Sequence, residues 1–202
     1  MTTLGQNVTR ETIEDKIPKF LDILLTWNRS INLTSRKLAT HDLKKHIEEA
    51  EYLATVIDQS KAIIDVGSGN GLPGMILAIF GFNCILVERN AKKAAFLNEV
   101  KYQLNLNVTI LNIDIKDIQA HIGLGESFNI VSKAVGDPKM IIKLCQAVIG
   151  CDTSIYLPKN DNILFDKQCL KDLCQFKLDI IKNPSLEGNV IWKLTEIEFN
   201  GK

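Results

Sequence analysis

Apolar residues in the first part of the chain recur every three or four positions, the spacing of a helix that packs on one face. The first series predicts a helix over residues 9–31. Pro18 should kink or split it, because proline lacks a backbone donor and clashes with the preceding turn. The second series predicts a helix that begins near Thr40, whose hydroxyl can cap the first turn. We therefore expect N-terminal helices over residues 1–58.

From residue 61 the pattern changes to short apolar runs that alternate with helical segments. Strands are expected near residues 61–66, 83–88, 107–111, 128–132 and 153–157, and helices near residues 72–81, 90–104 and 137–149. Such alternation predicts a parallel sheet with right-handed crossovers.

The end of the chain follows another pattern. A helix is predicted near residues 161–174, and two strands, 176–182 and 189–197, are then joined by a turn, so the last strand should run antiparallel. The expected fold is α/β, with a seven-stranded, mostly parallel, Rossmann-like sheet over residues 61–202. With the N-terminal helices it would form a single domain over residues 1–202.

A glycine-rich turn stands between the first predicted strand and the following helix. Ile63–Val66 is apolar except for Asp65, and Gly67, Gly69 and Gly71 follow it. Glycine allows a sharp turn and lets a ligand approach without a Cβ in the way. The helix that follows presents unpaired N–H groups and a positive dipole. This segment predicts a pocket for a nucleotide-like cofactor, S-adenosylmethionine, formed by Asp65, Gly67, Ser68, Gly69, Gly71 and Leu72.

The glycine spacing separates two cofactor classes. A dinucleotide-binding loop has the pattern G-x-G-x-x-G, but Leu72 occupies the position of its third glycine. The G-x-G-x-G spacing instead resembles motif I of the class I methyltransferases. Glu88 ends the next predicted strand, where a carboxylate can accept hydrogen bonds from both ribose hydroxyls. A glycine turn without a ligand and a solvated acid at the strand end are the alternative interpretations.

Composition limits the other classes of function. The 202 residues are 46% hydrophobic, which is enough for a full core, and no apolar run is long enough to span a membrane. The first residues lack the pattern of a signal peptide, so we expect a cytoplasmic protein. The five cysteines are expected to be reduced and mostly buried, with Cys169 and Cys174 on one helix. Neither they nor the three histidines have the spacing of a metal site.

The formal net charge is zero, which counts against a nucleic-acid substrate. Basic residues nevertheless occur in small clusters, each by default a solvated face. Arg36–Lys37, Lys44–Lys45 and Lys133 would form a positive rim if the fold brought them together.

Three segments together resemble one family. They are Trp27–Asn28 with Asn32–Leu33–Thr34 and His46, the run Asp65–Gly74, and the helix that begins Lys92–Lys93. They are similar to the W-N-x-x-x-N-L-T…H, D-V-G-S-G-x-G-L-P-G and K-K-x-x-F-L signatures of the ribosomal small-subunit methyltransferase G family, also called glucose-inhibited division protein B. The similarity covers nearly the whole chain. It implies S-adenosylmethionine-dependent methylation of guanine N7 in 16S rRNA of the small ribosomal subunit.

The resemblance also implies roles for individual residues. It places the cofactor against Gly67 and Leu72, against Ile115 and Lys116 after the third strand, and against Lys133, where the family has an arginine. Lysine keeps the charge but lacks the planar fork. The implied contacts on the substrate side are Asn28, Asn32, His46, Lys133 and Lys159.

The chain departs from the family pattern mainly on that side. Glu48–Glu49–Ala50 replaces the Asp–Ser pair that follows the histidine, Lys159–Asn160 replaces Lys–Gly, and Gly188–Asn189 replaces Arg–His. The cofactor site is therefore better supported than the RNA site.

The implied chemistry needs no catalytic base, because guanine N7 carries a lone pair and no proton. Alignment with the methyl group is sufficient, and orientation alone can supply about 7–11 kcal/mol. The chain has neither the [ND]-P-P-[YF] motif of amino-group methyltransferases nor the Pro-Cys pair of pyrimidine C5 enzymes. Two alternatives stay open: a small-molecule methyltransferase, which the neutral charge favours, and a cofactor-binding, ribosome-associated module without activity.

Overall fold

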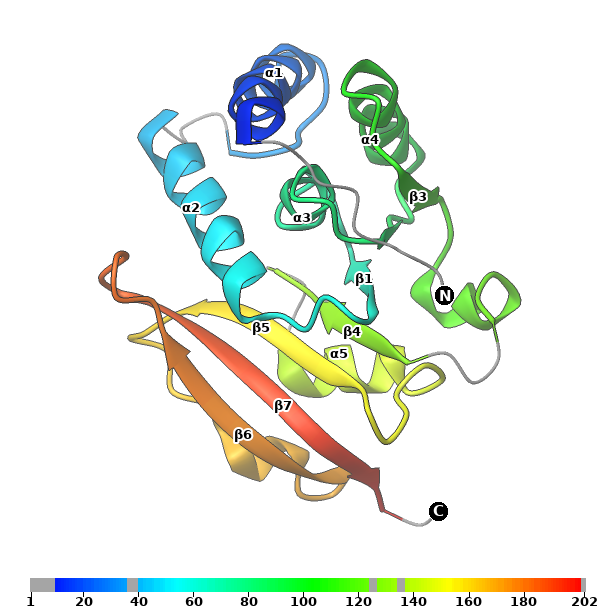
Figure 1. The fold of residues 1–202 in the computed structure, drawn as a ribbon. Helices are drawn as coiled ribbons and strands as arrows, with labels where there is room; N and C mark the ends of the chain where they lie inside the picture. Colours follow the sequence, from blue (N-terminus) through cyan, green and yellow to red (C-terminus); the bar gives the residue numbers. More distant parts are fainter. Residues whose placement is uncertain (1–9, 36–39, 124–126, 134–136, 201–202) are drawn as a thin grey trace.

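A computed structural model describes residues 10–35, 40–123, 127–133 and 137–200. Its described strands form one seven-stranded sheet in the order β3-β2-β1-β4-β5-β7-β6 (Figure 1). The strands are β1 (Ala62–Val66), β2 (Cys84–Val87), β3 (Val108–Leu111), β4 (Phe128–Val131), β5 (Ser154–Asn160), β6 (Cys174–Lys182) and β7 (Asn189–Phe199). The first five are parallel, and β7 runs antiparallel between β5 and β6. The α/β fold with an antiparallel last strand is therefore confirmed.

Helices cover both faces of the sheet. On one face lie α1 (Arg10–Asn28), α2 (Thr40–Val56), α3 (Gly74–Ile79) and α4 (Ala91–Gln103). On the other face lie the 3₁₀ helix η1 (Ile115–Ala120), α5 (Pro138–Cys145) and the 3₁₀ helix η2 (Lys167–Leu170). Successive strand residues point to opposite faces. Ile63 accordingly belongs to the first apolar core and Ile64 to the second.

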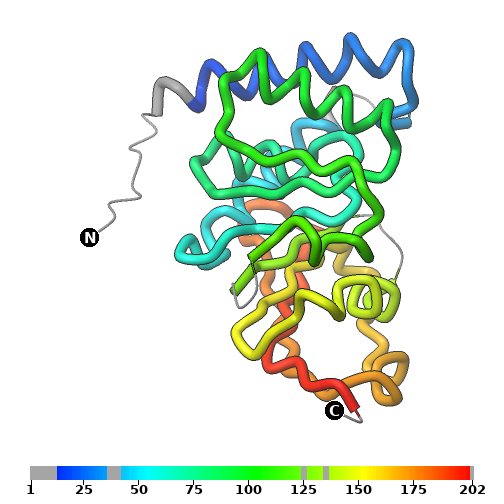
Figure 2. The backbone as a smooth tube through the Cα atoms, turned by 90° about the vertical axis from the view of Figure 1, so that its right-hand side faces the viewer, coloured from blue at the N-terminus to red at the C-terminus, as the bar shows by residue number. Residues whose placement is uncertain are grey.

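The N-terminal helices share the apolar core of the sheet. Phe20, Leu24 and Leu53 are fully buried in the same cluster as Leu86 of β2. Figure 2 shows α1 lying along α4. The ring of Trp27 meets that of Phe96 edge-on, with 6.0 Å between the ring centroids. Packing therefore fixes the N-terminal helices against the part of the sheet that carries the glycine loop.

One sequence prediction about helices is wrong, a second is wrong as far as it concerns a split at Pro18, and a third lies outside the described side chains. Residues 10–28 form one helix with Pro18 inside it, so the proline does not split the helix. The helix predicted over residues 161–174 is instead a loop followed by η2 and the first residue of β6. The capping role of Thr40 falls among the side chains that the structure does not describe.

The predicted helix fails because its apolar residues do not share one face. Ile163 and Leu164 are exposed, whereas Phe165 turns inward against the rings of Phe176 and Trp192. The carboxylate of Asp166 then accepts a hydrogen bond from the Gln168 N–H and starts the short 3₁₀ turn.

The same correction changes the predicted positions of two cysteines. Cys169 lies in η2 and Cys174 begins β6, so they do not share a helix. All five thiols are free, and three of them are buried, as expected. Burial raises the pKa of Cys145 to about 12, so this thiol stays protonated at neutral pH.

A buried carboxyl group closes the turn between β1 and α3. The Asp65 side chain is 1% exposed, and its Oδ2 accepts a hydrogen bond from the Gly74 N–H at 3.1 Å. Burial raises the pKa of Asp65 to about 7, although the hydrogen bond from the Gly74 N–H shifts this pKa in the opposite direction. A Cβ on Gly74 would collide with this group, lying 3.0 Å from both Cβ and Cγ of Asp65. Glycine is therefore required at position 74 by close approach.

This contact predicts that Gly74→Ala destabilises the protein by about 1–3 kcal/mol, the usual cost of overpacking a core. Gly150→Ala is the control, because a Cβ there meets nothing closer than 4.0 Å, at Thr153 Oγ1. The control variant should be unchanged or slightly more stable, since alanine restricts the unfolded chain. Urea denaturation of both variants measures the difference, and equal midpoints would contradict the close contact.

Candidate functional site

A large cavity of the described structure opens at the carboxyl ends of β1, β2, β3 and β4. The chain adds β2 and β3 on one side of β1 and then crosses to β4 on its other side. Open α/β sheets bind ligands at such a reversal of strand order. The cavity has a volume of about 500 Å³. Its lining includes Gly67, Ser68, Gly69, Leu72, Glu88, Ile115, Lys116 and Lys133, all predicted from the sequence.

The two other predicted loop residues are not part of the wall. Asp65 lies beneath the loop, where it holds Gly74, and Gly71 is buried against Met75 and Phe20. The backbone of the loop is tied to β2, because the N–H groups of Gly67 and Ser68 both donate to the carbonyl oxygen of Val87. The turn is thus held in place by strand β2 and by Asp65.

Glu88 is fixed before any ligand is present. The residue is 7% exposed. Its Oε2 accepts a hydrogen bond from the Gly69 N–H at 2.9 Å, and its Oε1 accepts one from the Asn90 N–H at 2.8 Å. Gly69 has a φ of +49°, the left-handed region that favours glycine. Each carboxylate oxygen has a second lone pair, so both can still accept from a ligand in the cavity.

The segment after β3 contributes more residues to the cavity wall than were predicted from the sequence. Ile113 and Asp114 line the cavity together with the predicted pair Ile115 and Lys116. Asp114 Oδ1 accepts a hydrogen bond from the Lys116 N–H at 3.1 Å and so begins η1. An acid just after a parallel strand was the available signal, the same signal that identified Glu88. The other lining residues that were not predicted from the sequence are Leu33, Val66, Asn70, Val87, Arg89, Lys93, Met140 and Leu144.

The tryptophan and the first asparagine of the N-terminal signature act through the core and the backbone, respectively. Trp27 packs against Phe96, and neither Asn28 nor Asn32 lines the cavity. Asn28 Oδ1 instead accepts hydrogen bonds from the N–H groups of Leu33 and Thr34, at 2.9 and 3.0 Å. These bonds shape the turn after α1 and place Leu33 in the cavity wall.

A polar cluster lies where α2 meets the end of β4. Lys133 Nζ donates to Glu49 Oε2, and it lies 2.7 Å from His46 Nδ1. Burial raises the pKa of Glu49, but the hydrogen bond with His46 and the charge of Lys133 outweigh it and hold this pKa below its usual value. Burial lowers the pKa of Lys133, and Glu49 opposes that shift. The ammonium group is therefore paired with a carboxylate.

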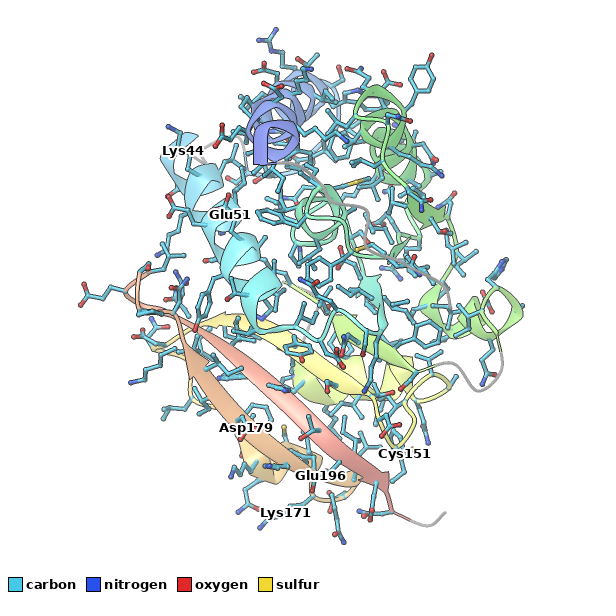
Figure 3. All side chains as sticks on the ribbon, viewed as in Figure 1. Lys44, Glu51, Cys151, Lys171, Asp179 and Glu196 are labelled. Atoms are coloured by element: carbon cyan, nitrogen blue, oxygen red, sulfur yellow. The ribbon has the colours of Figure 1, made fainter. Side chains whose placement is uncertain are left out.

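Only part of the predicted positive rim is assembled in the described residues. Lys45 is near enough to Lys133 to lower the pKa of Lys133 further. Lys44 is exposed near the N-terminal end of α2 (Figure 3). Arg36 and Lys37 lie outside the described residues.

Lys159 lies apart from the main cavity. It lines a small separate cavity with Glu49, Tyr52 and Asn189, and its Nζ is 5.8 Å from the centroid of the Trp192 ring. Burial lowers the pKa of Lys159. The five implied substrate-side residues therefore do not form one surface: Lys133 alone lines the main cavity, with His46 beside it.

Within the described residues, no group of three or more metal-ligating side chains is found. Over the same part of the chain, no helix is both long and apolar enough to cross a membrane.

Solved structures share this fold at low sequence identity. A mutant of MtNAS in complex with S-adenosylmethionine has a TM-score of 0.61 and 13% identity, over 91% of this chain and 75% of that one. The O-methyltransferase from Bacillus cereus in complex with SAH has a TM-score of 0.54 and 14% identity, over 88% of this chain and 90% of that one. The fold is that of the class I methyltransferases.

Curated relatives share the sequence. A ribosomal RNA small subunit methyltransferase G from Gluconobacter oxydans is 41% identical over 105 residues, which covers 52% of this chain and 54% of that protein. Proteins of the same name are similar over most of the chain. The one from Francisella philomiragia is 32% identical over 91% of this chain and 85% of its own length. The one from Bartonella tribocorum is 29% identical over 95% of this chain and 91% of its own length.

The family model for rRNA small subunit methyltransferase G matches residues 13–186. This range includes the turn shaped by Asn28, the glycine loop, Glu88 and the cluster around Lys133. The chain belongs to the rRNA small subunit methyltransferase G (GidB) family.

Proposed function

We propose that this protein is an S-adenosylmethionine-dependent methyltransferase that methylates guanine N7 in 16S rRNA of the small ribosomal subunit, and that it acts in the cytoplasm. The observation that carries the proposal is the family match over residues 13–186, which spans both the N-terminal signature and the cofactor loop. The cavity supports it, because about 500 Å³ is within the size range of small-molecule sites.

The residues at the cavity fit this cofactor. Glu88 is the acceptor for the ribose hydroxyls, and the backbone of Gly67–Gly69 allows close approach of the nucleoside. Asp114 and Ile115 form the wall after β3, and Lys133 is a cation at the wall near α2. Bound S-adenosylmethionine supplies a methyl group that its positively charged sulfur makes electrophilic.

The protein contributes alignment and exclusion of water. The N7 lone pair of guanine is available at neutral pH, so the reaction needs no proton transfer in the methylation step. The fixed loop, Leu33 and Leu72 shape the cavity in which the two reactants would meet. The Glu49 carboxylate offsets the charge of Lys133, which limits repulsion between this ammonium group and the positively charged cofactor.

The net charge of zero favours one other candidate, a methyltransferase that acts on a small molecule. A nucleic-acid substrate is normally matched by an overall basic surface. The two candidates differ in which molecule carries the methyl group after the reaction.

The activity predicts a modified guanine in 16S rRNA. Purified protein incubated with S-adenosylmethionine and small subunits or 16S rRNA from a strain that lacks the gene should add one methyl group to a guanine. Mass spectrometry of nuclease fragments would locate it, and the lability of N7-methylguanine to alkaline reduction and aniline would identify the position. Ribosomal RNA that stays unmodified under these conditions would reject the RNA substrate.

Gly69→Ala should weaken cofactor binding at least tenfold. A Cβ at this position lies on the cavity wall, and it meets only ordinary contacts at 3.6 Å or more within the protein, so the fold should survive. Gly188→Ala is the control, since Gly188 also has a positive φ, +81°, but does not line the cavity. Calorimetry with S-adenosylhomocysteine should separate the two variants. Equal affinities would show that the cofactor does not lie against Gly69.

Glu88→Ala should weaken cofactor binding by about 1.5–3 kcal/mol, the range for hydrogen bonds to a charged group. Part of this loss would come from the loop, because the Gly69 and Asn90 N–H groups lose their acceptor. A 2′,3′-dideoxy analogue of the cofactor isolates the ribose contribution, since it experiences only the loop effect. Titration of both ligands should therefore show a smaller loss for the analogue. The ribose assignment fails if both ligands lose the same affinity.

A further inference from the structure

A second hollow lies beside the cofactor cavity. It has a volume of about 440 Å³ and is lined by Lys116, Asp137, Lys139, Met140, Lys143 and Leu144. Lys116, Met140 and Leu144 also line the cofactor cavity, so the two spaces share a wall. We call the second hollow the α5 groove, because all its lining residues except Lys116 and Asp137 belong to α5.

The α5 groove is rich in positive charge. Lys139 and Lys143 are four positions apart on α5, a spacing that places both side chains on one face of a helix. The carboxylate in the lining, Asp137, caps α5 by accepting a hydrogen bond from the Met140 N–H at 2.7 Å. The ion pairs found among the described residues involve none of Lys116, Lys139 and Lys143. These ammonium groups differ in this respect from Lys133, which Glu49 neutralises.

We propose that the α5 groove binds the phosphate backbone of the RNA strand next to the target guanine. This proposal rests on the proposed function, since it concerns the same substrate. A base can reach a methyl donor inside a cavity only if it leaves the stack, and its backbone then remains at the mouth. The α5 groove shares a wall with the cofactor cavity and supplies three cations.

The overall charge favours a local groove of this kind. A chain with a net charge of zero has no long-range attraction for a polyanion, so phosphate contacts must come from a local concentration of cations. Met140 is 49% exposed in the lining, and it offers apolar surface to a sugar or a base beside the ammonium groups. This combination of separated cations and apolar surface suits the phosphates and bases of an RNA strand.

The test uses the full chain with two lysines replaced, Lys139→Gln with Lys143→Gln. The matched control is Lys101→Gln with Lys171→Gln, which removes the same charge. Lys101 lies in the last turn of α4, and Lys171 directly follows η2 (Figure 3). Neither control lysine lines the cofactor cavity or the α5 groove. Binding to a 16S rRNA fragment is measured across a salt series for the wild type and both variants.

The groove variant should lower the magnitude of the logarithmic salt slope by about 1.4–1.8, which corresponds to two lost phosphate contacts. Its KM for RNA should rise at least tenfold in methylation assays at moderate salt. Its affinity for S-adenosylhomocysteine should stay within twofold of wild type, because neither replaced lysine lines the cofactor cavity. The control variant should match the wild type in all three measurements.

Each other outcome has a distinct meaning. Equal salt slopes for the groove variant and the control, with methylation intact, overturn the α5 groove but leave the proposed function standing. A groove variant that loses cofactor affinity assigns the lysines to the cofactor instead and also overturns the proposal. Wild-type protein that neither binds nor methylates the RNA would reject the proposed function and the groove together.

Discussion

The hydrogen bond from the Gly74 N–H to the Asp65 carboxyl group joins the end of β1 to the beginning of α3 and so closes the turn between them. Everything at the site depends on this turn having one shape. With the turn closed, the Gly67 and Ser68 N–H groups reach the Val87 carbonyl oxygen, and the Gly69 N–H reaches Glu88. The loop is thereby attached to two neighbouring strands. A carboxyl group buried this deeply is tolerated because it is hydrogen-bonded and because its pKa, about 7, lets it hold a proton for part of the time at neutral pH.

Features that depend on neighbouring residues could be predicted from the sequence. The glycine loop lies within one short segment, and Glu88 follows the next apolar run, so local pattern was enough to place both at one sheet edge. Asp114 carried the same signal after the third strand but was not identified. The helix expected at residues 161–174 failed because spacing alone does not tell whether Ile163 and Leu164 face the core.

Features that depend on tertiary packing could not be predicted in this way. Glu49 and Lys133 are 84 positions apart, and only the packing of α2 against the end of β4 brings them together. In the sequence, residues 48–50 and Lys133 are separate departures from the family pattern, yet in the fold Glu49 and Lys133 are partners. The role of Asn28 was similarly hidden, since it shapes a turn and Leu33 reaches the cavity in its place.

The two backbone hydrogen bonds to Glu88 have a consequence for the entropy of binding. A glutamate side chain that is free in solution must give up several rotamers when a ligand orders it, at a cost of about 0.5–1.5 kcal/mol. Here the Gly69 and Asn90 N–H groups have already selected one rotamer during folding. A ligand that reaches this carboxylate therefore meets an acceptor that does not have to be immobilised, and its hydrogen-bond energy is not reduced by that loss. Folding, rather than binding, has set the rotamer of Glu88.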